Sequence, residues 1–352
     1  MNWENNVRRV VPYVAGEQPQ NPKIIKLNTN ECPYPPSPKV AEALRGYDTA
    51  DLRKYPDMNI TPLIEALAGL HGISPEQIFV GIGSDDVLSM AFLTFFNSGK
   101  PILFPDVTYS FYDVWADLYK IPYECQPLDE GFNIVKTDYF KENGGIVIAN
   151  PNAPTAILAK VSDLEEIIQA NPDSVVIIDE AYIDFALESK DSCLPLIDKY
   201  DNLLVTRTFS KSRSMAGMRI GYACGSKKLI KYLNDVKFSF NSYTLSTPAI
   251  LAGVASVEDN DYFVSTCNKV RATRTRIFQE LQRLGFEETV SSTNFLFAAH
   301  EKVSAQQIFD ALKENGIYVR HWNKPRIDNF LRITVGTDEE MDTLVTFLKS
   351  YL

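Results

Sequence analysis

The chain has 352 residues, 45% of them hydrophobic and 23% charged, a composition that excludes wholesale disorder and a length that suits about two domains. Its net charge of −10 argues against a general polyanion binder, so we expect any anionic ligand to be held by a local basic site. No apolar run approaches the ~20 residues of a membrane helix, and the first ten residues lack the apolar core of a signal peptide. We therefore expect a cytoplasmic protein without a membrane or nucleic-acid partner.

The N-terminal forty residues are rich in proline and asparagine, which predicts an extended arm. Helical patterns follow over 38–47 and 61–70. Short apolar runs then alternate with helical patterns, with strands predicted at 78–80, 101–104, 145–149, 175–178 and 203–205. Helices are predicted from Ser84, from about Tyr109 and over 162–170. This alternation predicts a mostly parallel sheet that is buried on both faces.

The C-terminal part has a different pattern. A long helix is predicted over 262–284, followed by strands near Phe295, at 317–320 and at 331–335. Asp338 is predicted as the N-cap of a final helix. We therefore expect an α/β fold with an N-terminal arm over 1–45, a large domain over 46–245 and a small α+β domain over 246–352, against which the arm packs.

Polar residues follow four of the predicted strands, at 81–86, 150–152, 179–182 and 208–211. The carboxyl ends of parallel strands meet at one edge of a sheet, and ligands of such sheets bind beyond that edge. The sequence therefore predicts that these four clusters converge on one pocket. Neither the five scattered cysteines nor the three isolated histidines predict a disulfide framework or a metal site.

The segment 208–222 carries the strongest motif, because Lys211 is followed by Gly217 and then by Arg219. This spacing closely resembles the pyridoxal phosphate (PLP) lysine motif of the fold-type I aminotransferases. A lysine amine that is deprotonated in a sheltered site can form a Schiff base. The resemblance implies that Lys211 binds PLP covalently and that Thr208, Ser210 and Arg219 belong to the cofactor site, with hydroxyl and guanidinium groups for a phosphate.

Two further residues of the predicted pocket suit the cofactor ring. Asp179, at the end of a buried strand, can keep a pyridine nitrogen protonated, and the charged ring then withdraws electrons from the substrate carbon. Tyr182 lies three residues further on, within reach of the ring's phenolic oxygen. Glu180 is interpreted as a structural or helix-start acid.

The segment 81–86 predicts a tight turn that leads into a helix, whose free N–H groups suit a phosphate. Ser84 and Asp85 are the predicted contacts, with the backbone amides as donors despite the acidic side chain. Tyr109, at the start of the next predicted helix, can stack on the pyridine ring. With Lys211, Asp179 and Tyr182, it completes the predicted catalytic group.

Residues 150–156 resemble the family sequence Pro-Asn-Asn-Pro-Thr-Gly, with two departures. Ala153 replaces the asparagine that binds the phenolic oxygen, and Ala156 replaces the glycine. Because alanine cannot donate that hydrogen bond, Tyr182 must serve alone or be assisted by Asn152 or a water. The alternative role for Asn152 is formation of the turn.

Five more segments resemble successive signatures of the histidinol-phosphate aminotransferases, at 8–13, 27–33, 53–57, 245–249 and 331–337. Each is weak alone, but their order and spacing together are specific. The resemblance implies ping-pong transfer of an amino group between histidinol phosphate and 2-oxoglutarate, giving imidazole acetol phosphate and glutamate, in histidine biosynthesis.

The same resemblance implies the substrate site. Arg332 is the first choice and Arg320 the second for binding the phosphate or carboxylate, while Tyr13 and Asn30 line the substrate side. Tyr55 resembles a tyrosine that reaches the PLP phosphate of the other subunit, which implies a homodimer.

Three alternatives remain open at the level of the sequence. A threonine-phosphate decarboxylase would use the same cofactor residues but release carbon dioxide, and an aromatic amino acid aminotransferase would differ in its substrate. A non-catalytic PLP-fold binding protein is the third, although the intact Lys211 and Asp179 argue against it.

Overall fold

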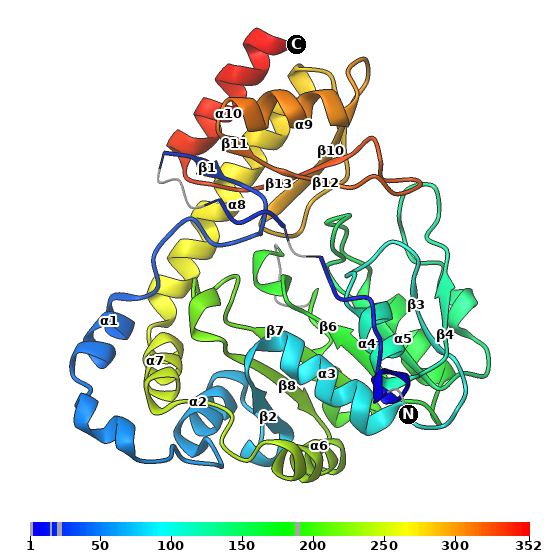
Figure 1. The fold of residues 1–352 in the computed structure, drawn as a ribbon, viewed down its shortest axis with the longest axis vertical. Coiled ribbons are helices and arrows are strands. Elements are labelled where there is room, and N and C mark those ends of the chain that lie inside the picture. Colours follow the sequence, from blue (N-terminus) through cyan, green and yellow to red (C-terminus); the bar gives the residue numbers. More distant parts are fainter. Residues whose placement is uncertain (1–2, 15, 20–22, 187–190) are drawn as a thin grey trace.

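The computed structural model describes residues 3–14, 16–19, 23–186 and 191–352. It contains a seven-stranded sheet, a four-stranded sheet and a two-stranded pairing. In Figure 1 the large sheet occupies the lower part of the molecule and the four-stranded sheet the upper part, and the long helix α8 (Asn260–Arg283) rises from near α7 into the upper part. No helix in these ranges is long and apolar enough to cross a membrane.

The large sheet has the strand order β2-β8-β7-β6-β5-β3-β4. Its strands are β2 (Ile78–Gly81), β3 (Ile102–Pro105), β4 (Tyr123–Gln126), β5 (Gly145–Ala149), β6 (Val176–Asp179), β7 (Leu203–Thr208) and β8 (Gly221–Gly225). The pairings among β4, β3, β5, β6 and β7 are parallel, whereas β8 is antiparallel to both β2 and β7. The predicted mostly parallel α/β sheet is therefore confirmed.

Helices cover both faces of this sheet. The side chains of each strand alternate between the two faces, so each strand contributes to both cores. Ile146 and Ile148 pack in one core with helices α2 (Thr61–His71), α5 (Val161–Ala170) and α7 (Thr247–Glu258). Val147 and Ala149 pack in the other core with α3 (Gly83–Phe95), α4 (Tyr112–Tyr119) and α6 (Lys227–Phe240). Both faces are thus apolar, which leaves the strand ends as the place for polar chemistry.

The C-terminal sheet has the order β12-β13-β10-β9, from Arg320–His321, Leu331–Thr334, Phe295–His300 and Phe286–Glu288. Helices α8, α9 (Ala305–Glu314) and α10 (Asp338–Tyr351) contribute to the core on one of its faces, together with Leu331 and Ile333. Arg332 lies between these two residues and therefore points to the opposite face, toward the large sheet.

The N-terminal segment is tied to the C-terminal part by β1 (Ile25–Lys26), which pairs in parallel with β11 (Ile317–Tyr318). Helix α1 (Pro38–Arg45) contacts α7. Short 3-10 helices lie at Trp3–Asn6, Thr49–Arg53, Pro75–Gln77, Lys136–Tyr139, Ile183–Phe185, Leu194–Asp198 and Ala216–Met218.

The structure differs from the predicted elements in several respects. The helix expected from about Tyr109 begins at Tyr112, and the strands β1, β4, β8 and β9 and the helices α6 and α9 were not predicted. Helix α7 shares a core with the large sheet, and the domain boundary at 246 stays a prediction. The N-cap of α10 is Thr337 and not Asp338, since the Thr337 hydroxyl accepts from the Glu340 backbone and the Glu340 carboxylate from the Thr337 N–H.

This capping box generates a stability prediction. Thr337→Ala removes the side-chain acceptor of an N-terminal N–H of α10 and should lower the free energy of unfolding by about 1 kcal/mol. Thr343→Ala on the same helix is the matched control, because the Thr343 hydroxyl bonds only within the helix at an exposed position. Thermal melting of both variants measures the effect, and equal small losses would contradict the assigned cap.

Candidate active site

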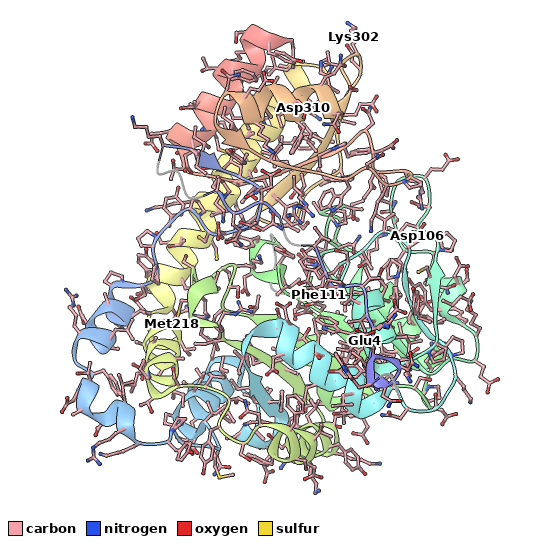
Figure 2. All side chains as sticks on the ribbon, in the orientation of Figure 1. Glu4, Asp106, Phe111, Met218, Lys302 and Asp310 are labelled. Atoms are coloured by element: carbon pink, nitrogen blue, oxygen red, sulfur yellow. The ribbon has the colours of Figure 1, made fainter. Side chains whose placement is uncertain are left out.

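Two adjoining cavities lie between the large sheet and the C-terminal sheet. The inner one, of ≈ 220 Å³, lies over the carboxyl ends of the parallel strands, and the outer one, of ≈ 540 Å³, extends toward β12 and β13. Both are lined by Thr29, Asp85, Tyr109, Ala153, Tyr182 and Lys211. Figure 2 shows side chains filling the region between the sheets, with Phe111 near the middle of the view. The structure thus brings residues of all four predicted segments to one place, although Pro151 is the contribution of 150–152.

Asp179 is the buried acid of the inner cavity, at the end of β6 and only 5% exposed. The Tyr112 hydroxyl donates to its Oδ2 at 3.0 Å, and the Thr206 hydroxyl donates to its Oδ1 at 3.2 Å from the facing position on β7. Burial raises the pKa of the Asp179 carboxyl to about 6. No lysine or arginine in the described ranges forms an ion pair that would offset this rise. The site therefore favours a cationic partner, and a protonated pyridine nitrogen fits it.

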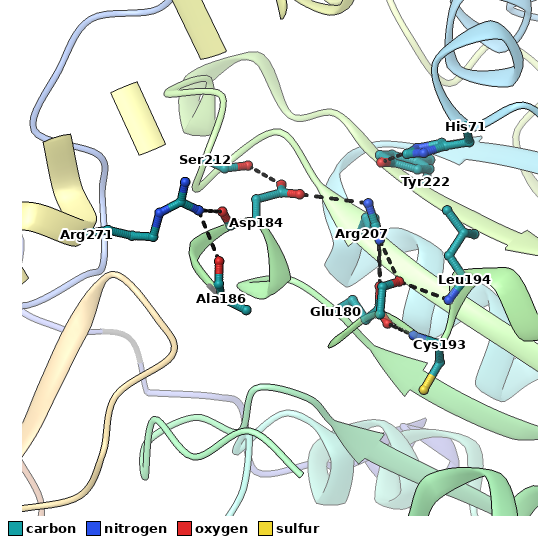
Figure 3. A network of polar contacts seen from close by, with 11 residues as sticks. His71, Glu180, Asp184, Ala186, Cys193, Leu194, Arg207, Ser212, Tyr222 and Arg271 are labelled. Atoms are coloured by element: carbon teal, nitrogen blue, oxygen red, sulfur yellow. Dashed lines mark hydrogen bonds and ion pairs between the residues drawn. The ribbon is translucent and has the colours of Figure 1, made fainter. Parts of the chain in front are cut away.

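Glu180 points away from the cavity into a network of buried polar groups (Figure 3). Arg207 donates to Glu180 Oε2 through Nε at 3.1 Å and through a terminal nitrogen at 2.8 Å. Arg207 also faces Asp184, which accepts a hydrogen bond from Ser212, the residue after Lys211. Glu180 is therefore a structural acid, and its network holds the loop that carries Lys211.

A cradle for an anion lies at the start of α3, where Ser84, Ser210 and Arg219 line the inner cavity. Two glycines permit this close approach. A Cβ on Gly83 would lie 2.6 Å from the Arg219 guanidinium, and one on Gly221 would lie 2.3 Å from the Ser84 backbone nitrogen. Free backbone N–H groups and a guanidinium at one point suit a phosphate.

Asp85 and Thr208 have other partners around this cradle. The Asp85 carboxylate lies 3.5 Å from the Arg219 guanidinium and accepts from the Tyr109 hydroxyl at 2.9 Å. Thr208 is absent from the described cavity lining, and its hydroxyl accepts from the Ser210 N–H at 3.1 Å. Thr208 therefore shapes the turn before Lys211, whereas Asp85 and Tyr109 face the cavity.

Lys211 lies where the two cavities meet. Its Nζ donates to the Thr29 carbonyl at 3.2 Å and lies 5.7 Å from the centre of the Tyr182 ring. The Tyr182 hydroxyl in turn accepts from Asn30 Nδ2 at 2.9 Å. The Lys211 amine, the Tyr182 phenol and the Asp179 carboxyl therefore line one cavity. These groups suit a ring that carries an aldehyde, a phenolic oxygen and a basic nitrogen.

Asn152 has no free donor for a ligand. Its amide nitrogen donates to the Val107 carbonyl and to Thr155, both at 2.9 Å, and its oxygen accepts from Thr108 at 2.8 Å. It is not among the residues that line either cavity. The structure therefore favours the turn-forming role and places Ala153, not Asn152, at the cavity wall.

Arg332 supplies a cation to the outer cavity. One of its terminal nitrogens donates to the Asn28 carbonyl at 2.9 Å, whereas its buried Nε has no partner in the described ranges. Burial lowers the pKa of the guanidinium, and no described carboxylate forms an ion pair with it. The Trp322 ring centre lies 5.2 Å from Arg332 and 5.3 Å from Arg320. This arrangement suits the anionic end of a substrate.

Tyr13 and Tyr55 occupy contrasting places. Tyr13 stacks on Phe111 with 4.1 Å between ring centres and lines the outer cavity. Tyr55 is 80% exposed, stacks on Tyr243 at 4.5 Å and lies outside both cavity linings of this chain. The chain itself therefore does not bring Tyr55 to the site.

Sequence reasoning missed three residues that shape the site, namely Tyr112, Thr206 and Trp322. Thr206 interrupts an apolar strand with a polar side chain, a signal that could have been paired with Asp179. Tyr112 and Trp322 carry no such signal, because their roles depend on contacts with distant parts of the chain.

Comparisons with known proteins show the family of the chain. The sequence model of the aminotransferase class I and II family matches residues 22–348. A histidinol-phosphate aminotransferase of Lactococcus lactis subsp. cremoris (strain MG1363) is 52% identical over 352 residues, which cover 100% of this chain and 98% of that protein.

Solved structures show the same fold. The histidinol-phosphate aminotransferase from Sinorhizobium meliloti, in complex with pyridoxal-5'-phosphate, has a TM-score of 0.85 at 25% identity, covering 94% of this chain and 92% of that one. The L-threonine-O-3-phosphate decarboxylase from Porphyromonas gingivalis has a TM-score of 0.80 at 20% identity, covering 93% and 99%. The family match and the full-length similarity together show that this chain belongs to the class I and II aminotransferases, in the family of the histidinol-phosphate aminotransferases.

Proposed function

We propose that this protein is a PLP-dependent aminotransferase that moves an amino group between histidinol phosphate and 2-oxoglutarate. The observation that carries the proposal is the inner cavity, where the Lys211 amine, the buried Asp179 carboxyl and the Ser84–Ser210–Arg219 cradle face one space. When bound, PLP supplies an aldehyde that joins amines and a ring that withdraws electrons from the substrate carbon.

Each group that lines the inner cavity would have its own role toward the cofactor. The cradle would hold the cofactor phosphate, and Asp179 would keep a proton on the ring nitrogen. Lys211 would hold the cofactor between turnovers, and its Nζ would then take the proton from the substrate carbon and return it. Tyr109, held by Asp85, would limit movement of the ring.

The outer cavity supports a substrate with an anionic tail. Arg332 is half-buried, its buried Nε has no partner and no described carboxylate pairs with it, so an incoming phosphate or carboxylate would satisfy it. Histidinol phosphate and glutamate share an amine and an anionic group, and one arginine can serve both. Arg320 and Tyr13 would line the same space, beside Trp322.

A decarboxylase acting on threonine phosphate is the second candidate, because a protein of that name shares the fold. The 52% identity over the full chain to a histidinol-phosphate aminotransferase favours the transfer reaction. An aromatic amino acid aminotransferase differs only in the group that fills the outer cavity.

We further propose a homodimer in the cytoplasm, with Tyr55 reaching the partner's cofactor phosphate. Leu52, Tyr55, Phe240 and Tyr243 are apolar or aromatic and exposed, and two of them stack on each other. Such a patch suits an interface with a second copy.

The half-reactions test the function directly. Histidinol phosphate should bleach the visible absorbance of the PLP-loaded protein, and 2-oxoglutarate should restore it. Lys211→Ala should abolish multiple turnover, while Lys228→Ala, at an exposed position on α6, should not. Release of carbon dioxide from threonine phosphate without this cycle would instead support the decarboxylase.

Asp179→Asn tests the buried carboxyl. The pKa of Asp179 is raised on folding, so ionisation opposes folding, and this residue makes the cofactor-free protein less stable as pH rises through about 4 to 6. The melting temperature of the cofactor-free variant should therefore equal or exceed that of the wild type at pH 8. The difference between the two melting temperatures should be smaller at pH 5. The affinity of the variant for PLP should fall at least about 10-fold, because the cationic nitrogen loses its counter-charge. Unchanged affinity would contradict the assigned role.

Arg332→Ala should raise the KM for both histidinol phosphate and glutamate by about 10-fold or more, since each loses a charge-assisted hydrogen bond. Arg283→Ala is the matched control, because that arginine pairs with Glu280 at the surface. Steady-state kinetics with both substrates gives the answer, and an unchanged KM for both would remove Arg332 from the substrate site.

A further inference from the structure

The loss of an amide at position 153 leaves a specific gap in the cavity wall. The Ala153 side chain belongs to an apolar cluster with Ala156 and Phe295, and Tyr182 packs against this cluster. The Tyr182 ring meets Phe295 edge-on, with 5.2 Å between ring centres. The side of the cavity beside Ala153 therefore offers the hydroxyl of Tyr182 and no side-chain amide from position 153.

Asn30 holds that hydroxyl from behind. It is 1% exposed and is anchored to Thr334 on β13 by two hydrogen bonds. The Asn30 backbone N–H donates to the Thr334 hydroxyl at 3.0 Å, and that hydroxyl donates to Asn30 Oδ1 at 3.1 Å. Asn30 Nδ2 then donates to the Tyr182 hydroxyl at 2.9 Å.

The hydrogen bonds in this chain of groups run in one direction. The Thr334 oxygen accepts from the Asn30 backbone N–H, and the Thr334 proton points to Asn30 Oδ1. The Asn30 group that faces Tyr182 is consequently its NH₂, which has no lone pair to offer. The Tyr182 oxygen must therefore accept, and its own proton remains available to a group in the cavity.

We propose that Asn30 is a positioning residue that commits the Tyr182 hydroxyl to donate to the ring oxygen of bound PLP, in place of the side chain missing at Ala153. This inference rests on the proposed function. Asn30 contacts Tyr182 on one side and Thr334 on the other. The direction of the Tyr182 hydrogen bond therefore depends on a residue of β13 in the C-terminal sheet.

The consequence is a property of the Lys211 nitrogen. A hydrogen-bond donor stabilises negative charge on the ring oxygen. This stabilisation would be greater when the cofactor-bound Lys211 nitrogen has lost its proton than when it still carries one. Loss of the oriented donor should therefore make that proton harder to remove. The pH midpoint of the cofactor's visible absorbance measures this directly, without turnover.

The test compares PLP-loaded wild type with Asn30→Ala and Asn30→Gly. Asn30 has φ +57, so the glycine variant keeps the backbone conformation if the alanine variant folds poorly. Both should raise the absorbance midpoint by about one pH unit. Adding Ala153→Asn to either variant should move the midpoint back down, because a second donor then faces the ring oxygen.

Asn28→Ala is the matched control. Asn28 is a buried asparagine on the same arm that also lines the outer cavity, but its amide donates to the Glu17 carbonyl and not to Tyr182. Its midpoint should equal that of the wild type.

Unchanged midpoints in both Asn30 variants, or a rise that Ala153→Asn does not reverse, would overturn the positioning role. A wild-type protein that gains no visible absorbance with PLP would instead overturn the proposed function, so the two failures are distinguishable.

Discussion

The site depends on one buried carboxyl, that of Asp179. Asp179 retains two hydroxyl donors, from Tyr112 and Thr206, but no described lysine or arginine pairs with it. An unpaired buried charge opposes folding, and the raised pKa of Asp179 expresses that cost. A bound cation would remove the penalty, so the same feature that weakens the empty protein favours its cofactor.

Neighbouring residues of a strand point to opposite sides, so a residue that lines the cavities can follow one that packs elsewhere. Asp179 faces the cavity while Glu180, the next residue, faces the network with Arg207. Leu331 and Ile333 face the helices of the C-terminal part, while Arg332 faces the outer cavity. The cofactor and substrate sites are thus built from opposite sheets, whose polar side chains meet in the space between them.

Predictions from the sequence succeeded where a pattern is local. The apolar runs at 145–149 and 203–205 stand out from their neighbours and form β5 and β7, of which β7 continues to Thr208. The Lys211 motif is contiguous, so its chemistry could be inferred without the fold. The N-cap of α10 was misplaced by one residue, because Thr337 and Asp338 are both good capping residues.

The sequence could not predict contacts between distant parts of the chain. Asn30 is separated by 152 residues from Tyr182 and by 304 from Thr334, so their hydrogen bonds appear only in the folded protein. The same limit applies to Asn152, whose partners include Val107 on a different loop. Its sequence neighbours suggested a ligand, and its folded neighbours leave it no free donor.

Reduction of the PLP-loaded protein with borohydride, followed by peptide mass mapping, tests the central claim most directly. We expect a pyridoxyl group on Nζ of Lys211, in the peptide that contains the motif at 208–222. A label on a different lysine, or no label on a protein that is fully loaded with PLP, would contradict it.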